Sequence, residues 1–288
     1  MRISFTNAAG NSVVFSEGTR HMYRIRSREG LSHIPTDLQS QRAPNQNGAT
    51  LINQLFEPRD MTFDLMILGS KQEQIERRRL MNRIFNPLLG EGILHVVLDT
   101  GDEYIMSCVA DGTPNFIQDE VQGVFIQEAP LDLFAPDPFW RSVRVSQTPM
   151  TAYLGLWTFP FSFPIEFGQT GDFAYIDNDG DVPCPITIEF RGPALNPRID
   201  NVTTGEFIQI NREISATQRL EINTARGRDK KIEIVDEDGT RQSAWGWINP
   251  ESSLFNLVPG TNEINYSADE GADEATVIIT YQKRYVGI

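Results

Sequence analysis

The residue types that most often carry out chemistry are few in this chain, and their spacing does not suit catalysis. The three histidines, His21, His33 and His95, do not lie at metal-ligand spacing, and Cys108 and Cys184 do not form a Cys-x-x-Cys pair. No phosphate-binding loop, dinucleotide fingerprint or catalytic-triad motif is present. A glycosidase-like pair of carboxylates is a pattern that any chain with 39 acidic residues permits. The sequence therefore predicts no enzyme, no catalytic residue, no metal ion and no cofactor.

Residues 177–181 alternate carboxylates in a way that could bind Ca²⁺. An EF-hand loop has Gly at its sixth position and a bidentate Glu at its twelfth. Here Gly180 is fourth and Ile188 is twelfth. We therefore interpret the segment as a tight turn.

Trp245 and Trp247 lie two positions apart, and on a strand over 244–248 they would point to the same face. Such a pair could stack on a sugar ring, which would make the chain a carbohydrate-binding module in receptor recognition. The interpretation that we prefer for both tryptophans is a place in the hydrophobic core. Binding of glycans by the second half of the chain would separate the two.

Cysteine usage and hydropathy indicate the cellular context. Two cysteines in different halves of the chain are typical of buried, reduced thiols in a protein made in a cytoplasm. No apolar signal segment follows Met1, and no run approaches the ~20 apolar residues of a membrane span. We expect no export by that route and no membrane insertion.

The charge distribution favours protein partners over nucleic acid. A net charge of −14 repels phosphates unless basic residues are segregated. Basic residues outnumber acids between residues 20 and 83, whereas 84–140 contains acids and neither Lys nor Arg. Arg also dominates over Lys, and Arg is the cation preferred in protein interfaces. The pattern indicates a polarised, protein-binding N-terminal half.

The N-terminal half has the pattern of an α+β domain that is mostly β. Its one clear helix begins after Ser70, which forms a capping box with Glu73, and it is stopped by Pro87 and Gly90. One helical face is apolar, with Ile75, Leu80, Met81, Ile84, Phe85 and Leu88. The other carries Arg77, Arg78, Arg79 and Arg83, which either are solvated or meet an acidic partner. Runs in which apolar and polar residues alternate, or which are rich in residues that favour β-strands, predict strands at 2–5, 12–15, 22–26, 61–67, 93–98, 104–109 and 123–134.

The segment from residue 31 to residue 60 lacks periodicity and is rich in Gln, Asn, Pro and Ser. The simplest interpretation is a long surface loop. Loops of this length inside compact domains are often functional.

A stiff joint divides the chain at residues 131–140. Pro136 and Pro138 remove two backbone donors and hold their neighbours extended, so no helix can cross this point. Phe139 and Trp140 follow at once and could anchor the joint to a neighbouring surface. We predict two domains, 1–140 and 141–288, with Pro136, Pro138, Phe139 and Trp140 as an interdomain anchor.

The C-terminal half reads as an antiparallel β-sandwich. Aromatic and apolar residues occupy every second position from 157 to 167, which predicts a strand with one buried face. Short strands separated by turn signals follow, at 186–190, 207–210, 219–222, 231–235, 244–248, 263–266 and 275–281.

Several of these segments resemble one protein family when they are taken in order. They are Pro58-Arg59 before the alternating strand, the Ala-Pro-Asp-Pro-Phe-Trp run at 135–140, residues 179–183 leading into a strand, and the closing residues 281–288. Over essentially the whole chain the order is similar to that of the distal tail proteins (Dit) of long-tailed, siphovirus-type bacteriophages.

The resemblance implies a structural virion protein. The first domain would close into a ring, as a homohexamer, at the distal end of the tail, and connect the tail tube protein to the tail tip or baseplate. Partners would be further copies of the chain, tail-tip or tail-associated proteins, and a receptor-binding protein in host attachment. DNA would pass through the lumen without specific binding, and assembly would occur in the bacterial host cytoplasm. The second domain would resemble galectins and carbohydrate-binding modules.

The polarised charges suggest how such a ring would close. A cyclic assembly larger than a dimer joins two different surfaces of each subunit, and opposite charges favour that pairing. We expect Arg77, Arg78, Arg79 and Arg83 on the positive side and Asp99, Asp102, Glu103, Asp119 and Glu120 on the negative side. Unpaired acids would line the lumen.

Overall fold

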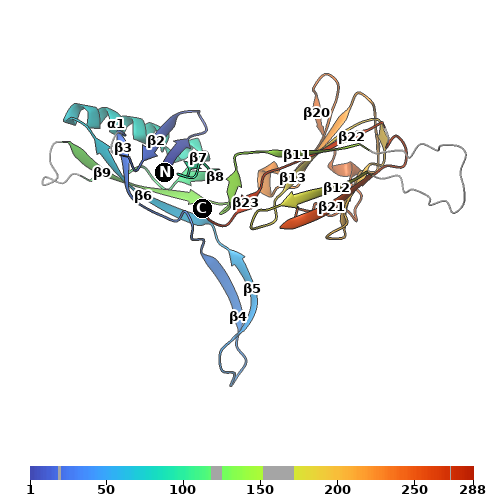
Figure 1. Cartoon of the computed structure of the whole chain (residues 1–288), viewed down its shortest axis with the longest axis horizontal. Coiled ribbons are helices and arrows are strands. Elements are labelled where there is room, and N and C mark those ends of the chain that lie inside the picture. The colour runs from blue at the N-terminus through green and yellow to red at the C-terminus, as the bar shows by residue number, and fades with distance from the viewer. Residues whose placement is uncertain (19–20, 118–124, 152–171, 273) are drawn as a thin grey trace, which may run out of the picture. The chain divides into compact units, whose positions relative to one another are not determined.

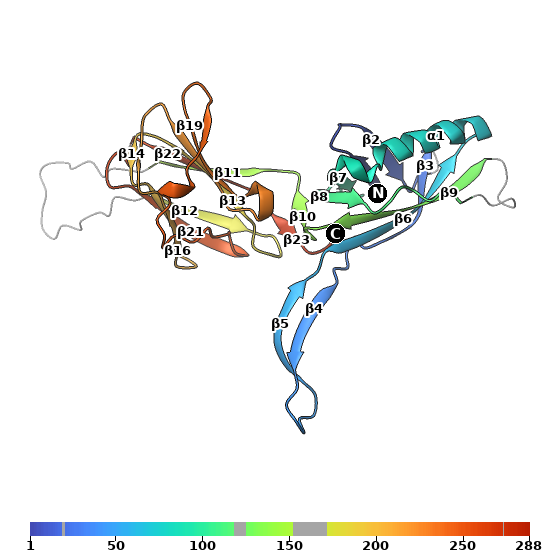
Figure 2. The same ribbon diagram turned by 180° about the vertical axis from the view of Figure 1, so that it is seen from behind.

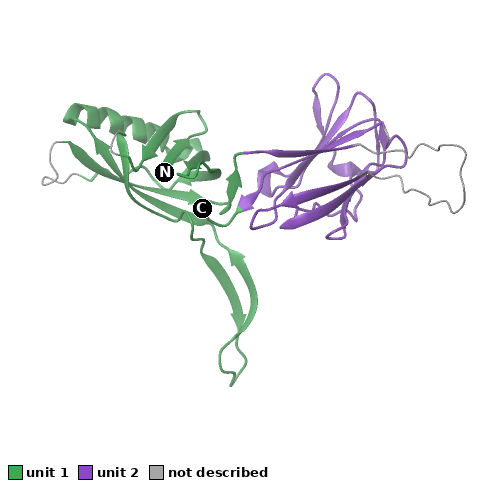
Figure 3. Ribbon diagram, viewed as in Figure 1, with its two compact units in different colours: residues 1–143, 285–288 green, residues 144–284 purple. Residues whose placement is uncertain are grey.

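The computed structural model describes residues 1–18, 21–117, 125–151, 172–272 and 274–288. The chain divides into two compact units, which Figure 3 shows in green and purple. Unit 1 comprises Met1–Val143 with Tyr285–Ile288, and unit 2 comprises Arg144–Arg284. Residues 285–288, which the sequence placed in the second domain, therefore group with unit 1.

Unit 1 is built on a nine-stranded sheet with the order β23-β10-β8-β7-β1-β2-β3-β6-β9. Strand β8 also pairs with β9 through Val109–Phe134 and Ala110–Leu133, so the strands from β8 to β9 close into a barrel. The mostly β fold with one main helix is confirmed for the described residues (Figures 1 and 2). The strands are β1 (Arg2–Thr6), β2 (Ser12–Ser16), β3 (Tyr23–Glu29), β6 (Arg59–Leu68), β7 (Gly92–Val97), β8 (Glu103–Ala110), β9 (Ile126–Ala135), β10 (Trp140–Ser142) and β23 (Arg284–Tyr285), of which Tyr285 belongs to unit 1.

The alternation predicted around residue 63 builds the barrel's core. In β6, Met61, Phe63, Leu65 and Ile67 are buried, whereas the residues between them face outward. This follows from the two-residue side-chain period of a strand. Their partners Leu131 and Leu133 on β9 are also buried, so the two strands share one inner face.

Helix α1 (Lys71–Ile84) has the predicted cap. The Ser70 side chain accepts from the Glu73 amide, and the Glu73 carboxylate accepts from the Ser70 amide at 2.8 Å. Met81, Ile84 and Phe85 are buried, and the Phe85 ring stacks on Phe5 at 4.8 Å between ring centroids.

Two members of the predicted apolar helix face are not buried. Leu80 is exposed because it precedes Met81 by one residue and is therefore turned by about 100° from it. Leu88 is also exposed, because α1 has ended and Leu88 lies on the short 3₁₀ helix η1 (Pro87–Leu89). Ile75 is half-buried.

The predicted surface loop at 31–60 is instead largely a β-hairpin. Strands β4 (Thr36–Gln41) and β5 (Thr50–Phe56) pair only with each other, in a two-stranded sheet. We call residues 36–56 the arm. It extends away from the barrel in both views (Figures 1 and 2). The hairpin could not be predicted from the sequence, because both of its faces are exposed and its strands therefore show no alternation between apolar and polar residues.

Two of the antiparallel sheets in unit 2 have inner side chains that share one core. The first has the order β11-β22-β13-β18-β19-β20 and the second β12-β21-β15-β16. Phe190 from the first and Tyr266 from the second belong to this core, with ring centroids 5.9 Å apart. The elements are β11 (Ser146–Thr151), β12 (Asp172–Asn178), β13 (Ile186–Arg191), β14 (Ala194–Leu195), β15 (Arg198–Asn201), β16 (Glu206–Gln209), β17 (Glu213–Ile214), β18 (Arg219–Asn223), η2 (Gly227–Asp229), β19 (Lys231–Val235), β20 (Arg241–Ser243), η3 (Trp245–Trp247), β21 (Gly260–Ser267) and β22 (Thr276–Tyr281).

Three local predictions in unit 2 have different outcomes. The segment at 177–181 turns around buried Asn178, whose side-chain oxygen accepts from the Gly180 amide at 3.1 Å. The predicted strand at 244–248 is wrong, because Trp245–Trp247 forms η3. The alternating run at 157–167 lies outside the described residues. Among the helices that are described, none is both long and apolar enough to span a membrane.

Candidate assembly surfaces

The arm presents large apolar side chains to solvent. Leu38, Leu51, Ile52, Leu55 and Phe56 are 46% to 63% exposed. From the register, Leu38 and Phe56 project from one face and Leu55 from the other. Asp37 is the one charged residue of the two strands. Because natural proteins protect exposed strands with charges or cover them, this ribbon, with a single charge in its strands, has the properties of a surface that binds protein.

The predicted anchor residues lie beside the root of the arm. Trp140 is fully buried, and its Nε1 donates to the Leu31 carbonyl at 2.8 Å. The Phe139 ring contacts the Phe56 ring edge to face, with centroids 5.5 Å apart. Pro138 is buried, whereas Pro136 is exposed. All of these contacts are made inside unit 1, and an interdomain role stays a prediction.

Arg59, at the start of β6, is a residue whose importance the sequence reasoning missed. Its side chain is fully buried. Its guanidinium donates to the backbone carbonyls of Gly30, Leu31, His33, Pro138 and Val286. The Pro58-Arg59 pair carried part of the family resemblance, but the sequence had no signal for these distant acceptors.

The four arginines of α1 differ in availability. Arg77 pairs with Glu73 one turn earlier at 3.1 Å, and its side chain is only 17% exposed. The Arg78 guanidinium lies 6.0 Å from the centroid of the Phe116 ring. Arg79 and Arg83 are exposed. The helix therefore offers a basic face in which Arg77 is already engaged.

The predicted acids gather at the turn between β7 and β8. Asp99 is exposed and pairs with the terminal amine of Met1, whereas Asp102 accepts from the Thr100 hydroxyl at 2.7 Å. Glu103 lies 2.8 Å from the His95 ring. Asp119 and Glu120 lie outside the described residues. No ion pair joins the described acids of this set to the α1 arginines.

A second acidic surface, on the outward face of β6 and β9, was not predicted. Asp60 and Asp64 project from β6, and Glu128 and Asp132 project from β9. Arg26 forms an ion pair with Glu128 at 2.5 Å, and the Thr62 hydroxyl donates to Asp132 at 2.7 Å. The alternation of β6 contains the signal, because the residues between the buried positions are those that face outward.

The two tryptophans considered for sugar stacking do not share a strand face. Both lie on η3, where successive side chains are separated by about a third of a turn. Trp245 is exposed, so the core position predicted for it is wrong. Trp247 packs against the core of unit 2, and its ring lies 4.6 Å from the Arg212 guanidinium. A role in sugar binding stays untested.

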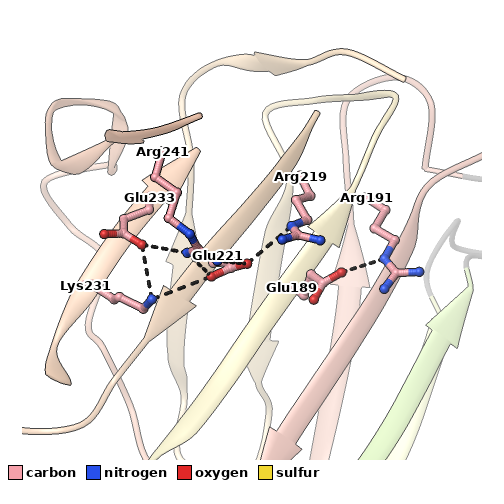
Figure 4. A network of polar contacts seen from close by, with 7 residues as sticks. All are labelled: Glu189, Arg191, Arg219, Glu221, Lys231, Glu233 and Arg241. Atoms are coloured by element: carbon pink, nitrogen blue, oxygen red, sulfur yellow. Dashed lines mark hydrogen bonds and ion pairs between the residues drawn. The ribbon is translucent and has the colours of Figure 1, made fainter. Parts of the chain in front are cut away.

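Unit 2 carries a charge network on the outward face of its six-stranded sheet (Figure 4). Glu189, Glu221 and Glu233 are direct cross-strand neighbours on β13, β18 and β19. Cations separate them: Arg241 lies 2.6 Å from Glu221 and 3.0 Å from Glu233, and Lys231 also lies near both. The hydrogen bond from Arg241 is the main cause that holds the pKa of Glu221 below its usual value. The network offsets the repulsion of the aligned carboxylates.

The two thiols are buried and unpaired with each other. Burial raises the pKa of Cys108 to about 12 and that of Cys184 to about 11. A raised pKa keeps a thiol protonated at neutral pH, whereas the thiolate is the nucleophilic form. Within the described residues, no three His, Cys, Asp or Glu side chains converge as metal ligands do.

Comparison with known proteins gives the fold a family context. Residues 179–285 match the family model of the siphovirus-type tail component, C-terminal domain. The crystal structure of SPP1 Dit, described as a paradigm of the hub adsorption apparatus in phages infecting Gram-positive hosts, is similar with a TM-score of 0.69 and 10% identity over 98% of both chains. A chain of the phage P2 baseplate in its activated conformation with Ca gives a TM-score of 0.56 and 11% identity, over 100% of this chain and 99% of that chain.

The same baseplate with Sr gives a TM-score of 0.55, again with 11% identity and with 100% and 99% of the two chains covered. No curated protein has a significantly similar sequence. Residues 179–285 thus match the C-terminal domain of siphovirus-type tail components, and the whole chain has the fold of SPP1 Dit, which is the fold that the ordered sequence motifs predicted.

Proposed function

We propose that this protein is a structural subunit of the distal tail hub of a siphovirus-type phage, without enzymatic activity. Copies of unit 1 close into a ring, a homohexamer, that connects the tail tube protein to the tail tip or baseplate. The similarity to SPP1 Dit over 98% of both chains supports the hub role. Tail-tip and receptor-binding proteins are the remaining partners that we propose, at the virion's distal tail end.

The exposed apolar side chains of the arm are the observation that best supports assembly into a ring. A two-stranded ribbon is marginally stable by itself, and this one also exposes apolar side chains on both faces. Covering it with a different surface of the next copy gives a heterologous contact, which closes into a ring when the rotation allows. Each subunit then provides one arm and one surface that receives an arm.

The first test compares masses in solution. The wild-type chain should sediment as a closed ring, whereas Leu51→Ser with Leu55→Ser should shift it towards monomer because the apolar contact is weakened. Gln39→Ala with Asn53→Ala, which changes polar residues of the same ribbon, is the matched control. A wild-type protein that stays monomeric at all concentrations would contradict the proposal.

Charge pairing is the proposed second component of ring closure. The exposed Arg79 and Arg83, with Arg78, would face the acids at the turn between β7 and β8 of the next subunit. Acids left unpaired would line the lumen and keep passing DNA from adhering.

Reversal of Arg78 and Arg79 to Glu should favour monomers at ~0.15 M salt, where charges more than roughly 8 Å apart are screened and only close pairs contribute. Arg226→Glu with Arg228→Glu makes the same change of charge at exposed positions of unit 2 and should not affect assembly. Rings that persist in the first variant would contradict charge closure and leave an apolar interface.

Receptor recognition through unit 2 is a second candidate function. Phe173 and Tyr175 project outward at alternate positions of β12 and are 45% and 70% exposed. Exposed aromatic rings can stack on sugars. Glycan-array binding that is lost in Tyr175→Ala would support this role, and a blank array would count against it.

A further inference from the structure

Arg59 is a buried cation held entirely by backbone carbonyls. Its Nε donates to the Pro138 oxygen at 2.9 Å, and its Nη1 donates to Gly30 at 2.7 Å and to Leu31 at 2.8 Å. His33 accepts from the same nitrogen at 3.2 Å, and Val286 accepts from Nη2. No described contact pairs Arg59 with a carboxylate. An ordinary salt bridge therefore does not explain why this charge is buried.

The acceptors come from chain segments that are far apart in the sequence. Residues 30–33 lead into the arm, and Arg59 itself follows the arm, so the guanidinium joins the two sides of the arm's root. The Glu57 amide closes that root by donating to the Pro35 carbonyl at 2.9 Å. Pro138 precedes the exit of the chain from unit 1, and Val286 follows its return. We call Arg59 with these carbonyls the junction.

Neighbouring contacts leave the junction little freedom. Trp140 donates to the Leu31 carbonyl, and the Arg59 guanidinium lies 6.0 Å from the centroid of the Trp140 ring. Gly30 has φ +83°, and a Cβ there would lie 2.1 Å from the Asp60 carbonyl oxygen. A Cβ on Gly287 would lie 2.9 Å from the Ser32 oxygen. The backbones thus approach so closely that a side chain would clash at Gly30, within the junction, and at Gly287, next to it.

The buried charge of Arg59 makes it unfavourable for the carbonyls that accept from it to move away. A buried guanidinium is destabilising unless its donors are satisfied, and here the planar fork is satisfied by acceptors in fixed directions. Burial lowers the pKa of Arg59 to about 10, so the group is charged at neutral pH. If one segment moves away, a donor of a buried charge loses its acceptor, which costs more than the loss of a neutral hydrogen bond. The junction therefore couples the positions of its segments.

We propose that Arg59 is a positioning residue for assembly: it fixes the direction of the arm and locks the arm's root to the segments at which the chain leaves and re-enters unit 1. This inference rests on the proposed function, in which the arm contacts a second copy of the chain. An arm held in one direction loses little conformational entropy on docking, so the junction preorganises the contact. Docking of the arm on a second copy is thereby coupled to the positions of the segments that lead to unit 2.

The test uses Arg59→Lys and Arg59→Met in the full chain. Lys keeps the charge but cannot reproduce the planar fork, and Met keeps much of the length without charge or donors. Hydrogen exchange should become faster by about tenfold or more at 30–33, 138–142 and 285–288 together, and in the arm. Strands β1 and β7 should keep the wild-type rate. The assembled fraction at equal concentration should fall in parallel.

The control is Arg26→Lys, which changes an exposed arginine on the same sheet that pairs with Glu128. It should leave exchange at the junction and in the arm unchanged. Gly30→Ala is a second probe, because its Cβ would clash with the Asp60 backbone and so disturb the junction while Arg59 itself stays unchanged. It should reproduce the exchange pattern of the Arg59 variants.

The outcomes separate this inference from the proposed function. A wild-type chain that does not assemble contradicts the ring, whatever Arg59 does. If the wild-type chain and Arg59→Lys assemble equally, with the same exchange in the arm, Arg59 does not position it. Faster exchange spread evenly over β1, β7 and the junction in both Arg59→Lys and Gly30→Ala would also overturn the inference, because Arg59 would then be a general core residue.

Discussion

The surroundings of the single residue Glu221 explain how unit 2 accommodates a row of neighbouring carboxylates. Its side chain is 13% exposed and lies within 4 Å of Arg219, Lys231 and Arg241. Removing its charge would leave three cations close together without their shared partner. The hydrogen bond from Arg241, followed by the charges of all three cations, holds the pKa of Glu221 low.

Glu221→Gln should therefore destabilise unit 2 by about 1 kcal/mol at neutral pH, the scale of a partly exposed ionic network. A depressed carboxyl pKa contributes stability above the unfolded pKa, and this contribution is lost as pH falls through the folded pKa. The difference from wild type should be constant above about pH 5 and shrink below the usual Glu pKa of about 4.3. Urea unfolding as a function of pH measures it. An equal effect of Glu237→Gln, at an exposed carboxyl, would contradict the network.

The two thiols should be inert in the folded protein. Burial raises the pKa of Cys108 to about 12 and of Cys184 to about 11, so neither forms appreciable thiolate at pH 8. A chromogenic disulfide reagent should label neither thiol in native protein and both in denaturant. Rapid labelling of one thiol under native conditions would show that its unit opens easily.

At the scale of elements, α1 illustrates a local signal that survives into the structure. The capping box joins residues three apart, so its geometry depends on little beyond the helix itself. Burial of Met81 and Phe85 then sets the helix against the barrel. The exposure of Leu80 and Leu88 shows that a list of apolar residues gives a face only approximately.

Ser70→Ala should lower the free energy of unfolding of unit 1 by about 1 kcal/mol, because an amide of the first turn loses its acceptor. Thermal unfolding followed by circular dichroism measures the loss. Gln72→Ala, on the exposed side of the same turn, is the control and should have almost no effect. A loss of equal size in both variants would mean that the cap is not the cause.

The arm illustrates the opposite case at the same scale. Its strands bury neither face, so the alternation that reveals a half-buried strand is absent between residues 36 and 56. Pairing of β4 with β5 satisfies the backbone, and the apolar residues remain exposed. The apolar residues of such an element are available for contact with another protein.

At the scale of the whole molecule, the chain end stabilises the unit in which the chain began. The Tyr285 ring contacts Tyr104 edge to face at 5.4 Å, and Val286 supplies an acceptor to Arg59. Ile288 packs against the core of unit 1. A fragment that stops at residue 143 lacks all three contributions.

Deletion of residues 285–288 from the full chain should lower the melting temperature of unit 1 by roughly 5 °C, since an unsatisfied donor on a buried charge costs at least 1–3 kcal/mol. Scanning calorimetry should show this shift, and the transition of unit 2 should stay in place. Equal shifts of both transitions would mean that the last residues do not belong to unit 1 alone.

Features that depend on residues close together in the chain could be predicted from the amino-acid sequence. Alternation around Phe63 and the capping box at Ser70 act over a few residues, and the ordered motifs predicted the distal-tail fold. The junction could not be predicted in this way, because Arg59 and its acceptor Val286 are 227 positions apart. The arm and η3 also could not be predicted, because their residues have no periodicity that distinguishes the arm from a loop or η3 from a strand. Local patterns record which side of a strand or helix is buried, whereas the carbonyls that converge on one buried charge are chosen only when the whole of unit 1 has folded.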